Sequence, residues 1–235
     1  MINTKEFIVS EFSENILLVS LKDDSKFSDT SSFFLSLSQH LRENIKGAVF
    51  TASEKSLSIK YDFCTLPSEE LTENLFSEIE KFKPSNKIKT RLKLDIPVLY
   101  SEEYGLDIKE ISSLCSLSIN EIAQIHSSKT YSVKMIGFTP GFAYLGDVDK
   151  NLRVPRRVEP RKNLLPGSIG ISNNRTGIYS LGGPGGWNIL GRTPINLFNP
   201  DLDNPFQILP DKQINFYPIN KDEFESILNT HKNEY

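Results

Sequence analysis

Glycine and proline are concentrated in one stretch of this chain of 235 residues. Residues 137–191 hold eleven of the thirteen glycines and five of the thirteen prolines, whereas the first 90 residues hold one glycine and two prolines. Glycine adopts backbone conformations that other residues resist, and both residue types are common in turns. The chain therefore joins two architectures, an amino-terminal part of regular elements and a later part of short elements and loops.

The amino-terminal part alternates between strand-like and helix-like patterns. Apolar residues recur with a period of two in some segments and at helical spacing in others. Six elements are predicted in the order β-α-β-β-α-β, over residues 15–21, 28–44, 47–52, 57–63, 67–82 and 91–96. This order is that of the ferredoxin-like split βαβ motif.

The later part is predicted to form two helices followed by short strands. The helices are predicted at 107–115 and 118–126, the second opened by a capping box of Ser118 and Glu121. Four strands are predicted at 131–136, 169–172, 195–198 and 213–218. Short strands separated by glycine and proline loops are typical of a closed β-barrel.

These patterns predict an α+β chain in three parts. The first is a ferredoxin-like domain over residues 1–90, the second a β-barrel domain over 91–220, and the third a tail or helix over 221–235.

Composition excludes several classes of function. The net charge of −3 argues against a nucleic-acid partner, which selects for a strongly basic face. No apolar run is long enough for a membrane span, and charged residues interrupt the first twelve residues, so a cytoplasmic location is expected. The three histidines lack metal-ligand spacing, and neither a Walker-type phosphate loop nor a Gly-x-Ser-x-Gly elbow is present. A self-contained hydrolase or metalloenzyme is therefore not predicted.

An aromatic, glycine-rich segment at 137–146 is the first candidate for a site. It presents Phe138, Pro140, Phe142 and Tyr144 between glycines that allow close approach of a ligand or partner. The alternative is that the phenylalanines belong to the barrel core; Tyr144, whose hydroxyl needs a polar partner, fits that alternative less well.

Arginines form the second candidate. Arg156, Arg157 and Arg161 lie between prolines that restrict the backbone, and Arg192 follows a glycine, so all four could bind a carboxylate or phosphate. The alternative is a solvated basic loop with incidental ion pairs.

Two further features complete the candidates. The segment 182–187 offers the backbone amides of Gly185 and Gly186 as an anion cradle beside Trp187, or else it is a tight corner under a core tryptophan. His126 is the best acid–base candidate in the chain, although a lone histidine is more often a packing or capping residue.

With these residues in view, the sequence resembles the family that contains the smaller 5-oxoprolinase subunit, allophanate hydrolase subunit 1 and the Kip inhibitor of a histidine kinase. The resemblance rests on an ordered series of motifs: Glu103–Gly105 with Asp107, His126–Ser127, Met135–Phe142, Tyr144–Gly146, Pro155–Arg157, Pro160–Arg161, Gly167–Ile171, Thr176–Tyr179, Pro184–Trp187 and Ile189–Pro194. It spans about residues 100–200.

The resemblance implies a cyclophilin-like barrel and an enzyme that is incomplete without partners. These are a larger homologous subunit and a lactam-utilisation-type subunit, which together open 5-oxo-L-proline to L-glutamate with ATP and Mg²⁺, bound by the complex rather than by this chain alone. The implied site has His126 and Tyr144 as catalytic residues, the four arginines with Gly185 and Gly186 as substrate or ATP contacts, and a pocket or partner surface of Phe138, Pro140, Phe142, Tyr179 and Trp187. Metal ligands are not expected in this chain.

Two other functions fit the same resemblance. One is inhibition of a histidine kinase by a binding module, and the other is a carboxyltransferase role in allophanate or urea metabolism. Three positions depart from the family pattern: Arg175 stands for Gln, Gly183 for Ser and Ala143 for Pro. These departures leave the identity of the amide or lactam substrate open.

Overall fold

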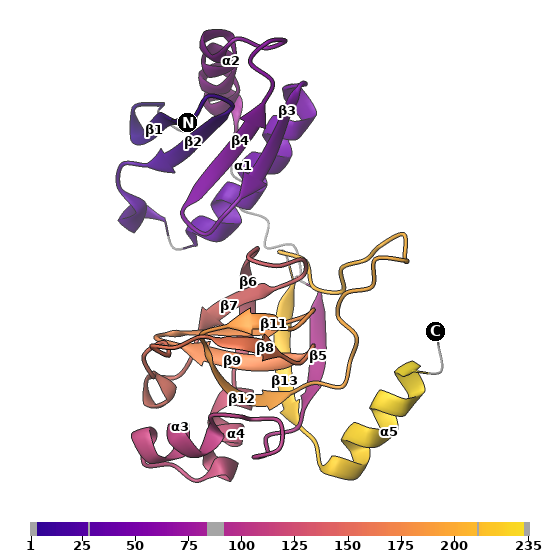
Figure 1. The fold of residues 1–235 in the computed structure, drawn as a ribbon. Coiled ribbons are helices and arrows are strands. Elements are labelled where there is room, and N and C mark those ends of the chain that lie inside the picture. The colour runs from indigo at the N-terminus through magenta and orange to yellow at the C-terminus, as the bar shows by residue number, and fades with distance from the viewer. Residues whose placement is uncertain (1–3, 28, 84–91, 211, 233–235) are drawn as a thin grey trace. The chain divides into compact units, whose positions relative to one another are not determined.

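A computed structural model describes residues 4–27, 29–83, 92–210 and 212–232 (Figure 1). They belong to two compact units, one within residues 1–90 and the other within 91–235. The predicted boundary after residue 90 falls at 84–91, outside the described residues. No helix in the described part of the chain combines the length and apolarity that crossing a membrane requires.

The first unit is an antiparallel sheet with two helices. Its strands pair in the order β1-β2-β4-β3. In chain order the elements are β1 (Phe7–Ser13), β2 (Ile16–Leu21), α1 (Thr30–Asn44), β3 (Ala48–Ala52), β4 (Ser56–Tyr61) and α2 (Ser68–Lys81), with short 3-10 turns at Thr4–Glu6 and Asp24–Lys26.

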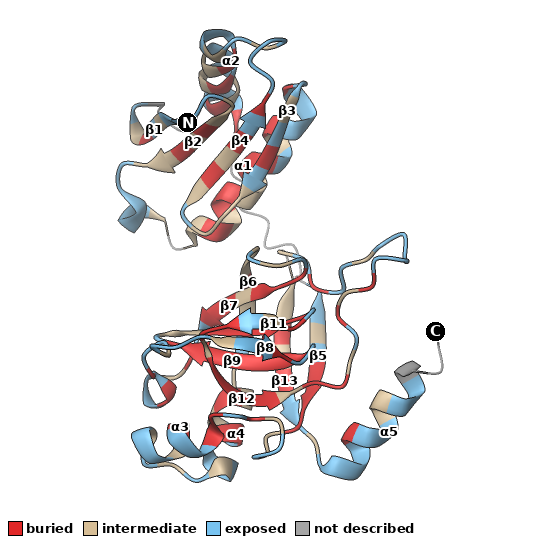
Figure 2. Cartoon of the chain, viewed as in Figure 1, coloured by how far each residue is buried: buried red, intermediate tan, exposed pale blue. Residues whose placement is uncertain are grey.

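Helix α1 begins where Asp29 accepts a hydrogen bond from the Ser32 amide, which satisfies one of the amides left free at a helix start. Its buried residues, among them Phe34 and Leu37, pack in one cluster with Leu75 of α2 and Ile59 of β4. Alternate residues along the strands are buried, so only one face of the sheet is covered (Figure 2).

The predicted βαββαβ order is wrong at both ends. A strand that the sequence analysis missed, β1, pairs with β2 at the edge of the sheet. The predicted last strand forms β5 (Lys93–Val98), which pairs with β13 in the second unit. Between these ends β4 lies between β2 and β3, the arrangement that a split βαβ motif requires. A complete ferredoxin-like domain stays a prediction.

The second unit is a seven-stranded sheet with helices around it. Its strands pair in the order β12-β9-β10-β7-β6-β13-β5, and β8 and β11 form a separate pair. After β5 the elements are α3 (Ile108–Cys115), α4 (Ile119–Ser127), β6 (Thr130–Ile136), β7 (Ala143–Asp147), a 3-10 turn (Lys150–Leu152), β8 (Arg161–Leu164), β9 (Ser168–Ser172), β10 (Arg175–Tyr179), β11 (Gly183–Gly185), β12 (Asn188–Arg192), β13 (Gln213–Pro218) and α5 (Lys221–Lys232).

The two edges of this sheet meet just beyond β5. Leu99 and Arg192 form an antiparallel bridge, with the Leu99 amide 2.9 Å from the Arg192 carbonyl oxygen and the Arg192 amide 3.2 Å from that of Leu99. A Cβ on Gly191 would lie 2.7 Å from the Leu99 carbonyl oxygen, so glycine is needed for this approach. The sheet therefore curls into a nearly closed barrel.

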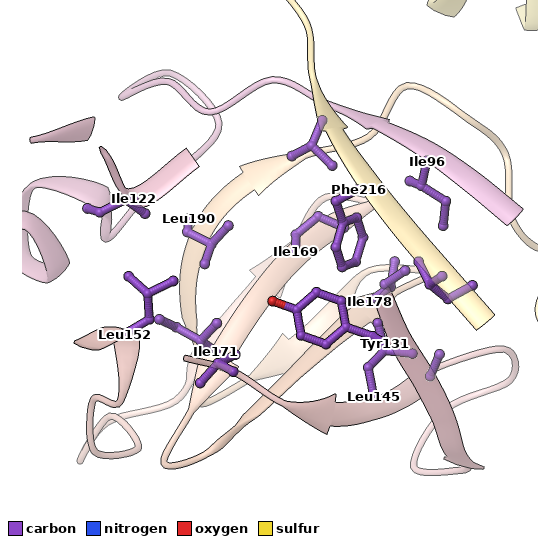
Figure 3. Close-up of a cluster of buried hydrophobic side chains, with 14 of the residues drawn as sticks. Ile96, Ile122, Tyr131, Leu145, Leu152, Ile169, Ile171, Ile178, Leu190 and Phe216 are labelled. Atoms are coloured by element: carbon purple, nitrogen blue, oxygen red, sulfur yellow. The ribbon is translucent and has the colours of Figure 1, made fainter. Parts of the chain in front are cut away.

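The barrel interior is filled by aliphatic side chains around Tyr131 and Phe216 (Figure 3). On β9 and β10 the residues Ile169, Ile171 and Ile178 belong to this core. Because side chains alternate along a strand, Gly170 and Gly177 face the opposite side of the sheet.

The capping box of Ser118 and Glu121 is confirmed at the start of α4. Strands predicted at 131–136, 169–172 and 213–218 are confirmed as β6, β9 and β13, and the terminal helix as α5. The strand predicted at 195–198 is wrong, since only Phe198 makes an isolated bridge, to Phe206.

Candidate functional site

An aromatic cluster lies on the face of the barrel sheet opposite the core. The Phe142 ring is 4.6 Å from that of Tyr144, 4.7 Å from Tyr179 and 5.5 Å from Trp187, all in edge-on contact. Tyr144 and Trp187 also meet, with ring centroids 5.8 Å apart. The structure thus brings together three of the predicted surface residues, Phe142, Tyr179 and Trp187, with the predicted catalytic residue Tyr144. Phe142 and Tyr179 are buried, whereas Tyr144 and Trp187 are partly exposed.

Two glycines form the floor of this cluster. Gly170 and Gly177 are direct partners across β9 and β10. A Cβ on Gly177 would lie 2.8 Å from the indole of Trp187, and one on Gly170 would lie 3.0 Å from the Trp187 Cβ. The absence of two side chains therefore makes the space that the tryptophan occupies.

The segment around Gly185 closes over Tyr179. A Cβ at Gly185 would lie 2.5 Å from the Tyr179 hydroxyl oxygen. That hydroxyl accepts a hydrogen bond from the Trp187 amide, but burial outweighs this contact and raises the pKa of Tyr179. Gly185 and the Trp187 amide thus serve to pack and satisfy a tyrosine.

Arg156 is the arginine that reaches this cluster. A Cβ on Gly186 would lie 2.9 Å from its Nε atom, so the guanidinium rests on the glycine beside Trp187. Burial raises the pKa of Tyr144, and the positive charge of Arg156 acts in the opposite direction. The phenol of Tyr144 is therefore a protonated hydrogen-bond donor at neutral pH, next to a cation.

A shallow depression of about 370 Å³ adjoins Arg156. It is lined by Glu110, Leu114, Asn188 and the segment 155–159. Arg156 thus stands between the aromatic cluster and an open surface hollow, which is the position of a side chain that meets a ligand from solvent.

Arg157 and Arg161, which were predicted to contact substrate or ATP, are both paired with a carboxylate of the same chain. Both bind the buried carboxylate of Asp107: Arg161 donates through two nitrogens, each 2.7 Å from a carboxylate oxygen, and Arg157 donates to Oδ1. Arg161 has thereby used both terminal nitrogens in a bidentate pair. Arg157 uses one terminal nitrogen, which also lies 3.3 Å from Glu110 Oε2, while its buried Nε has no partner among the described residues. These two arginines hold the structure together.

Arg192 is likewise engaged elsewhere. Its Nε donates to the Pro166 carbonyl oxygen at 2.8 Å, and its guanidinium lies 5.4 Å from the ring centroid of Tyr104 and 5.7 Å from that of Phe224. It anchors α5 to the end of β12 rather than joining the aromatic cluster.

His126 lies in the barrel interior with no exposed surface, which opposes its predicted role in moving a proton at a shared site. Its Nδ1 is 2.7 Å from the Tyr100 hydroxyl and its Nε2 is 2.9 Å from the Thr176 hydroxyl. Thr176 donates its own hydrogen to the Gly170 carbonyl oxygen, so Nε2 carries the proton and Nδ1 accepts from Tyr100. Burial lowers the pKa of His126 to about 3, and the ring is a neutral core group.

The loop before β7 carries Phe138 and Pro140 into solvent. Phe138 is 61% exposed and has a φ of 69°, a conformation that is unfavourable for a bulky residue. Beside it, the buried Oγ1 of Thr139 has no hydrogen-bond partner among the described residues. Strain, exposure of an aromatic ring and an unsatisfied hydroxyl together make this loop a candidate for a functional surface.

The departures from the family pattern have local explanations. Arg175 pairs with Asp147 at 2.8 Å, and Ala143 is buried in the barrel core. Gly183 has a φ of 94°, which glycine adopts without strain and serine does not.

Sequence reasoning missed the residues that organise the site. Asp107 entered only as part of a motif, and Asn188 and Thr176 were not singled out. The three clustered arginines do predict a carboxylate partner, because an arginine cluster in a folded core requires one, but Asp107 is separated by 50 and 54 residues from the two arginines that it binds, and nothing in the sequence pairs them. Within the described ranges, no group of three or more His, Cys, Asp or Glu side chains could hold a metal ion.

Comparisons with known proteins place this geometry in a family. The model for the carboxyltransferase domain, subdomain C and D, matches residues 7–208. The chain is 37% identical to a 5-oxoprolinase subunit of Escherichia coli O157:H7 over 65% of this chain and 68% of that protein. It is 32% identical to the corresponding 5-oxoprolinase subunit of Bacillus subtilis over 68% of this chain and 66% of that protein.

Solved structures agree in fold. A conserved uncharacterised protein from Pyrococcus horikoshii has a TM-score of 0.55 and 32% identity, over 92% of this chain and 100% of that one. The urea carboxylase of Kluyveromyces lactis has a TM-score of 0.75 and 17% identity, over 97% of this chain and 23% of that one. The match to the B. subtilis protein spans 66% of its length, and the match to urea carboxylase spans about a quarter of that enzyme.

Proposed function

The chain belongs to the carboxyltransferase domain, subdomain C and D, family, and from that premise we propose that it is the smaller subunit of an ATP-dependent 5-oxoprolinase. With a larger homologous subunit and a lactam-utilisation-type subunit, it would open 5-oxo-L-proline to L-glutamate. The relatives named as 5-oxoprolinase subunits support this assignment, as does the cyclophilin-like character that we infer for the barrel.

The position of Arg156 is the observation that carries the proposal. Of the four predicted arginines, Arg156 is the one that stands beside both the aromatic cluster and the surface hollow, and no ion pair with a carboxylate is found for it among the described residues. 5-Oxoproline is a small flat ring with a carboxylate. A guanidinium binds a carboxylate through two parallel hydrogen bonds, and aromatic rings contact the flat face of a lactam.

Tyr144 completes the arrangement. Because its pKa is raised by burial, the phenol keeps its proton and can donate to the lactam carbonyl oxygen, where negative charge develops when the ring is opened. Trp187 and Phe142 limit the access of water on the barrel side. We assign Arg156 to carboxylate binding, Tyr144 to carbonyl polarisation and the aromatic cluster to the ring face.

The residues of this chain do not fit a nucleoside triphosphate with Mg²⁺. Arg157, Arg161 and Arg192 already have partners, and the predicted cradle at Gly185 and Gly186 is covered by the Tyr179 hydroxyl and the Arg156 side chain. We therefore assign ATP and Mg²⁺ to the assembled complex, with their main contacts supplied by another subunit.

We further propose that the Phe138 loop contacts the larger subunit. An exposed phenylalanine held in a strained conformation is typical of a binding anchor rather than of a residue that stabilises its own chain. Pro140 in the same loop is also exposed. A cytoplasmic location accords with this assembly and stays a prediction.

A carboxyltransferase role in urea or allophanate metabolism is the second candidate, favoured by the fold shared with urea carboxylase. Inhibition of a histidine kinase is a third use of the same exposed surface, and no specific contact among the described residues favours it.

Reconstitution tests the proposal and separates the alternatives. The chain would be co-expressed with the larger and third subunits, and ATP-dependent turnover would be measured with 5-oxoproline, urea and allophanate. We expect glutamate release from 5-oxoproline by the complex and no turnover by this chain alone. Turnover of urea or allophanate with 5-oxoproline untouched would favour the second candidate.

A further inference from the structure

We infer that Asp107 is a positioning residue that places Arg156 over Gly186. The inference deepens the proposed function, because it explains how the arginine assigned to the substrate carboxylate is held, but its main test needs no enzymatic activity. Asp107 lies at the start of α3, and Arg156 lies in the loop that leads to β8.

Asp107 is a buried residue whose hydrogen bonds connect the start of α3 with the segment that leads into β8 and with β12. Its side chain accepts two hydrogen bonds from Arg161, one from Arg157 and one from the Ile189 amide at 2.7 Å. Its own amide donates to the Ile189 carbonyl oxygen at 2.9 Å. The carboxylate makes no cap on α3; it is directed entirely to the arginines and to β12.

These contacts hold the residues on both sides of Arg156. Arg157 follows directly and is held by its side chain at Asp107 and by its amide, which donates to the Gly186 carbonyl oxygen at 3.0 Å. Pro155 precedes it, and its carbonyl oxygen accepts from the Asn188 side chain at 2.8 Å. With both neighbours held against β12 and the segment before it, the backbone at Arg156 is fixed where its side chain lies over Gly186.

Apart from these backbone contacts at Pro155 and Arg157, the loop has no regular structure to hold it. Residues 155–160 belong to no helix or strand, so no ladder of backbone hydrogen bonds sets their position, and Val158 is 98% exposed. Of the donors to the Asp107 carboxylate, Arg157 belongs to the loop and Arg161 is the first residue of the strand that follows it, so the carboxylate holds the loop at its middle and at its end. Removing its charge would leave Arg161 without a carboxylate and Arg157 with only its 3.3 Å contact to Glu110, in a partly desolvated site, and the loop would move to solvate them.

Quenching of Trp187 fluorescence tests this inference directly, because Trp187 is the only tryptophan in the chain. Iodide is an anion that Arg156 attracts, whereas acrylamide is neutral. In the purified chain, Arg156→Ala should lower the ratio of iodide to acrylamide quenching roughly twofold, the local effect of one unit charge seen through water.

Loss of the Asp107 charge by itself would attract iodide and raise the quenching ratio, so a fall can come only from displacement of Arg156. Asp107→Asn should therefore lower the ratio in the wild-type background, and it should produce no fall in the Arg156→Ala background. Asp147→Asn is the matched control, because Asp147 forms an Asp–Arg pair with Arg175 elsewhere in the barrel; it should leave the ratio unchanged. If Asp107→Asn does not fold, Arg161→Lys is measured instead. Lysine keeps the positive charge but cannot form both hydrogen bonds to Asp107, so the quenching ratio should fall by less than in Arg156→Ala. The inference would be overturned if the folded Asp107→Asn variant had the same ratio of iodide to acrylamide quenching as wild type. It would also be overturned if both Arg161→Lys and Arg156→Ala had the wild-type ratio.

A kinetic measurement separates this inference from the proposed function. In the reconstituted complex, Asp107→Asn and Arg156→Ala should each raise the KM for 5-oxoproline about tenfold, and the double variant should raise it no further. Effects that multiply in the double variant would show that Asp107 acts independently of Arg156. A complex that does not turn over 5-oxoproline refutes the proposed function, while the quenching result still decides the role of Asp107.

Discussion

Trp187 lies against Gly177, with 2.8 Å between its Cζ3 atom and the point where a Cβ would stand on the glycine; from the same point Cζ of Phe142 is 3.0 Å away. The cluster that forms the candidate site is therefore built on missing side chains. Glycine is expected mainly in loops, but Gly170 and Gly177 lie within strands β9 and β10, where the absence of a side chain leaves room for Trp187.

Gly177→Ala should destabilise the barrel by about 1–3 kcal/mol, because an added methyl group must displace two aromatic rings. Urea unfolding followed by Trp187 fluorescence would measure the loss. Gly146→Ala is the control, since the nearest atom to its Cβ would be 3.7 Å away, an ordinary contact. Equal stability of the two variants would contradict the packing described here.

The stability of the second unit should fall as the pH falls below 6.5. The pKa of His126 is lowered to about 3 in the folded chain from 6.5, so between these values the unfolded chain binds a proton that the folded chain does not. The contribution of the neutral ring is complete above pH 6.5 and is lost towards pH 3, by roughly 1 kcal/mol per pH unit.

Chemical unfolding at pH 7, 6 and 5, with wild type and His126→Gln, would check this slope. The other two histidines are present in both proteins, so the difference between the two curves isolates His126. The variant should show the flatter dependence, and an identical slope would mean that His126 is solvated.

Helix α5 should detach when its aromatic anchor is removed. Phe224 is fully buried, stacks on Tyr104 at 4.7 Å and lies beneath Arg192. Phe224→Ala should cost about 3–5 kcal/mol in the local stability of the helix, seen as fast amide hydrogen exchange over 221–232. Phe138→Ala, at an exposed ring, should leave this exchange unchanged.

Phe138→Ala should weaken binding to the larger subunit while leaving the chain folded. Loss of an aromatic anchor at an interface costs about 2 kcal/mol or more, which is roughly thirtyfold in Kd. Calorimetric titration with the larger subunit would measure it, with Phe12→Ala, an exposed phenylalanine of the first unit, as the control. Unchanged affinity would place the interface elsewhere.

Sequence periodicity predicted the elements that follow simple patterns. The helices α1 to α4 and the strands β3, β4, β6 and β13 came from apolar spacing, and the cap of α4 from Ser118 and Glu121. Strands β10 and β11 were missed because glycines interrupt their pattern, and β1 because its outer half is exposed. The assignment of residues 93–98 to a sheet depends on pairing with β13, which lies more than a hundred residues away.

The candidate site was predicted in its residue types but not in its pairings. The proximity of Tyr144, Tyr179, Trp187 and Arg156 follows from the register of strands, and a series of motifs cannot supply it. Arg157 and Arg161 have the same chemistry as Arg156, and only the buried position of Asp107 separates the two structural arginines from the available one.

We propose above all that Arg156 binds the carboxylate of the substrate. The measurement is kcat/KM for ATP-dependent hydrolysis of 5-oxoproline by the reconstituted complex, with wild type, Arg156→Ala and, as a matched control, Arg153→Ala at an exposed position. We predict a loss of about 10- to 100-fold for Arg156→Ala, the value of a charge-assisted hydrogen bond, and no change for Arg153→Ala. Wild-type kcat/KM in the Arg156→Ala complex would contradict the account.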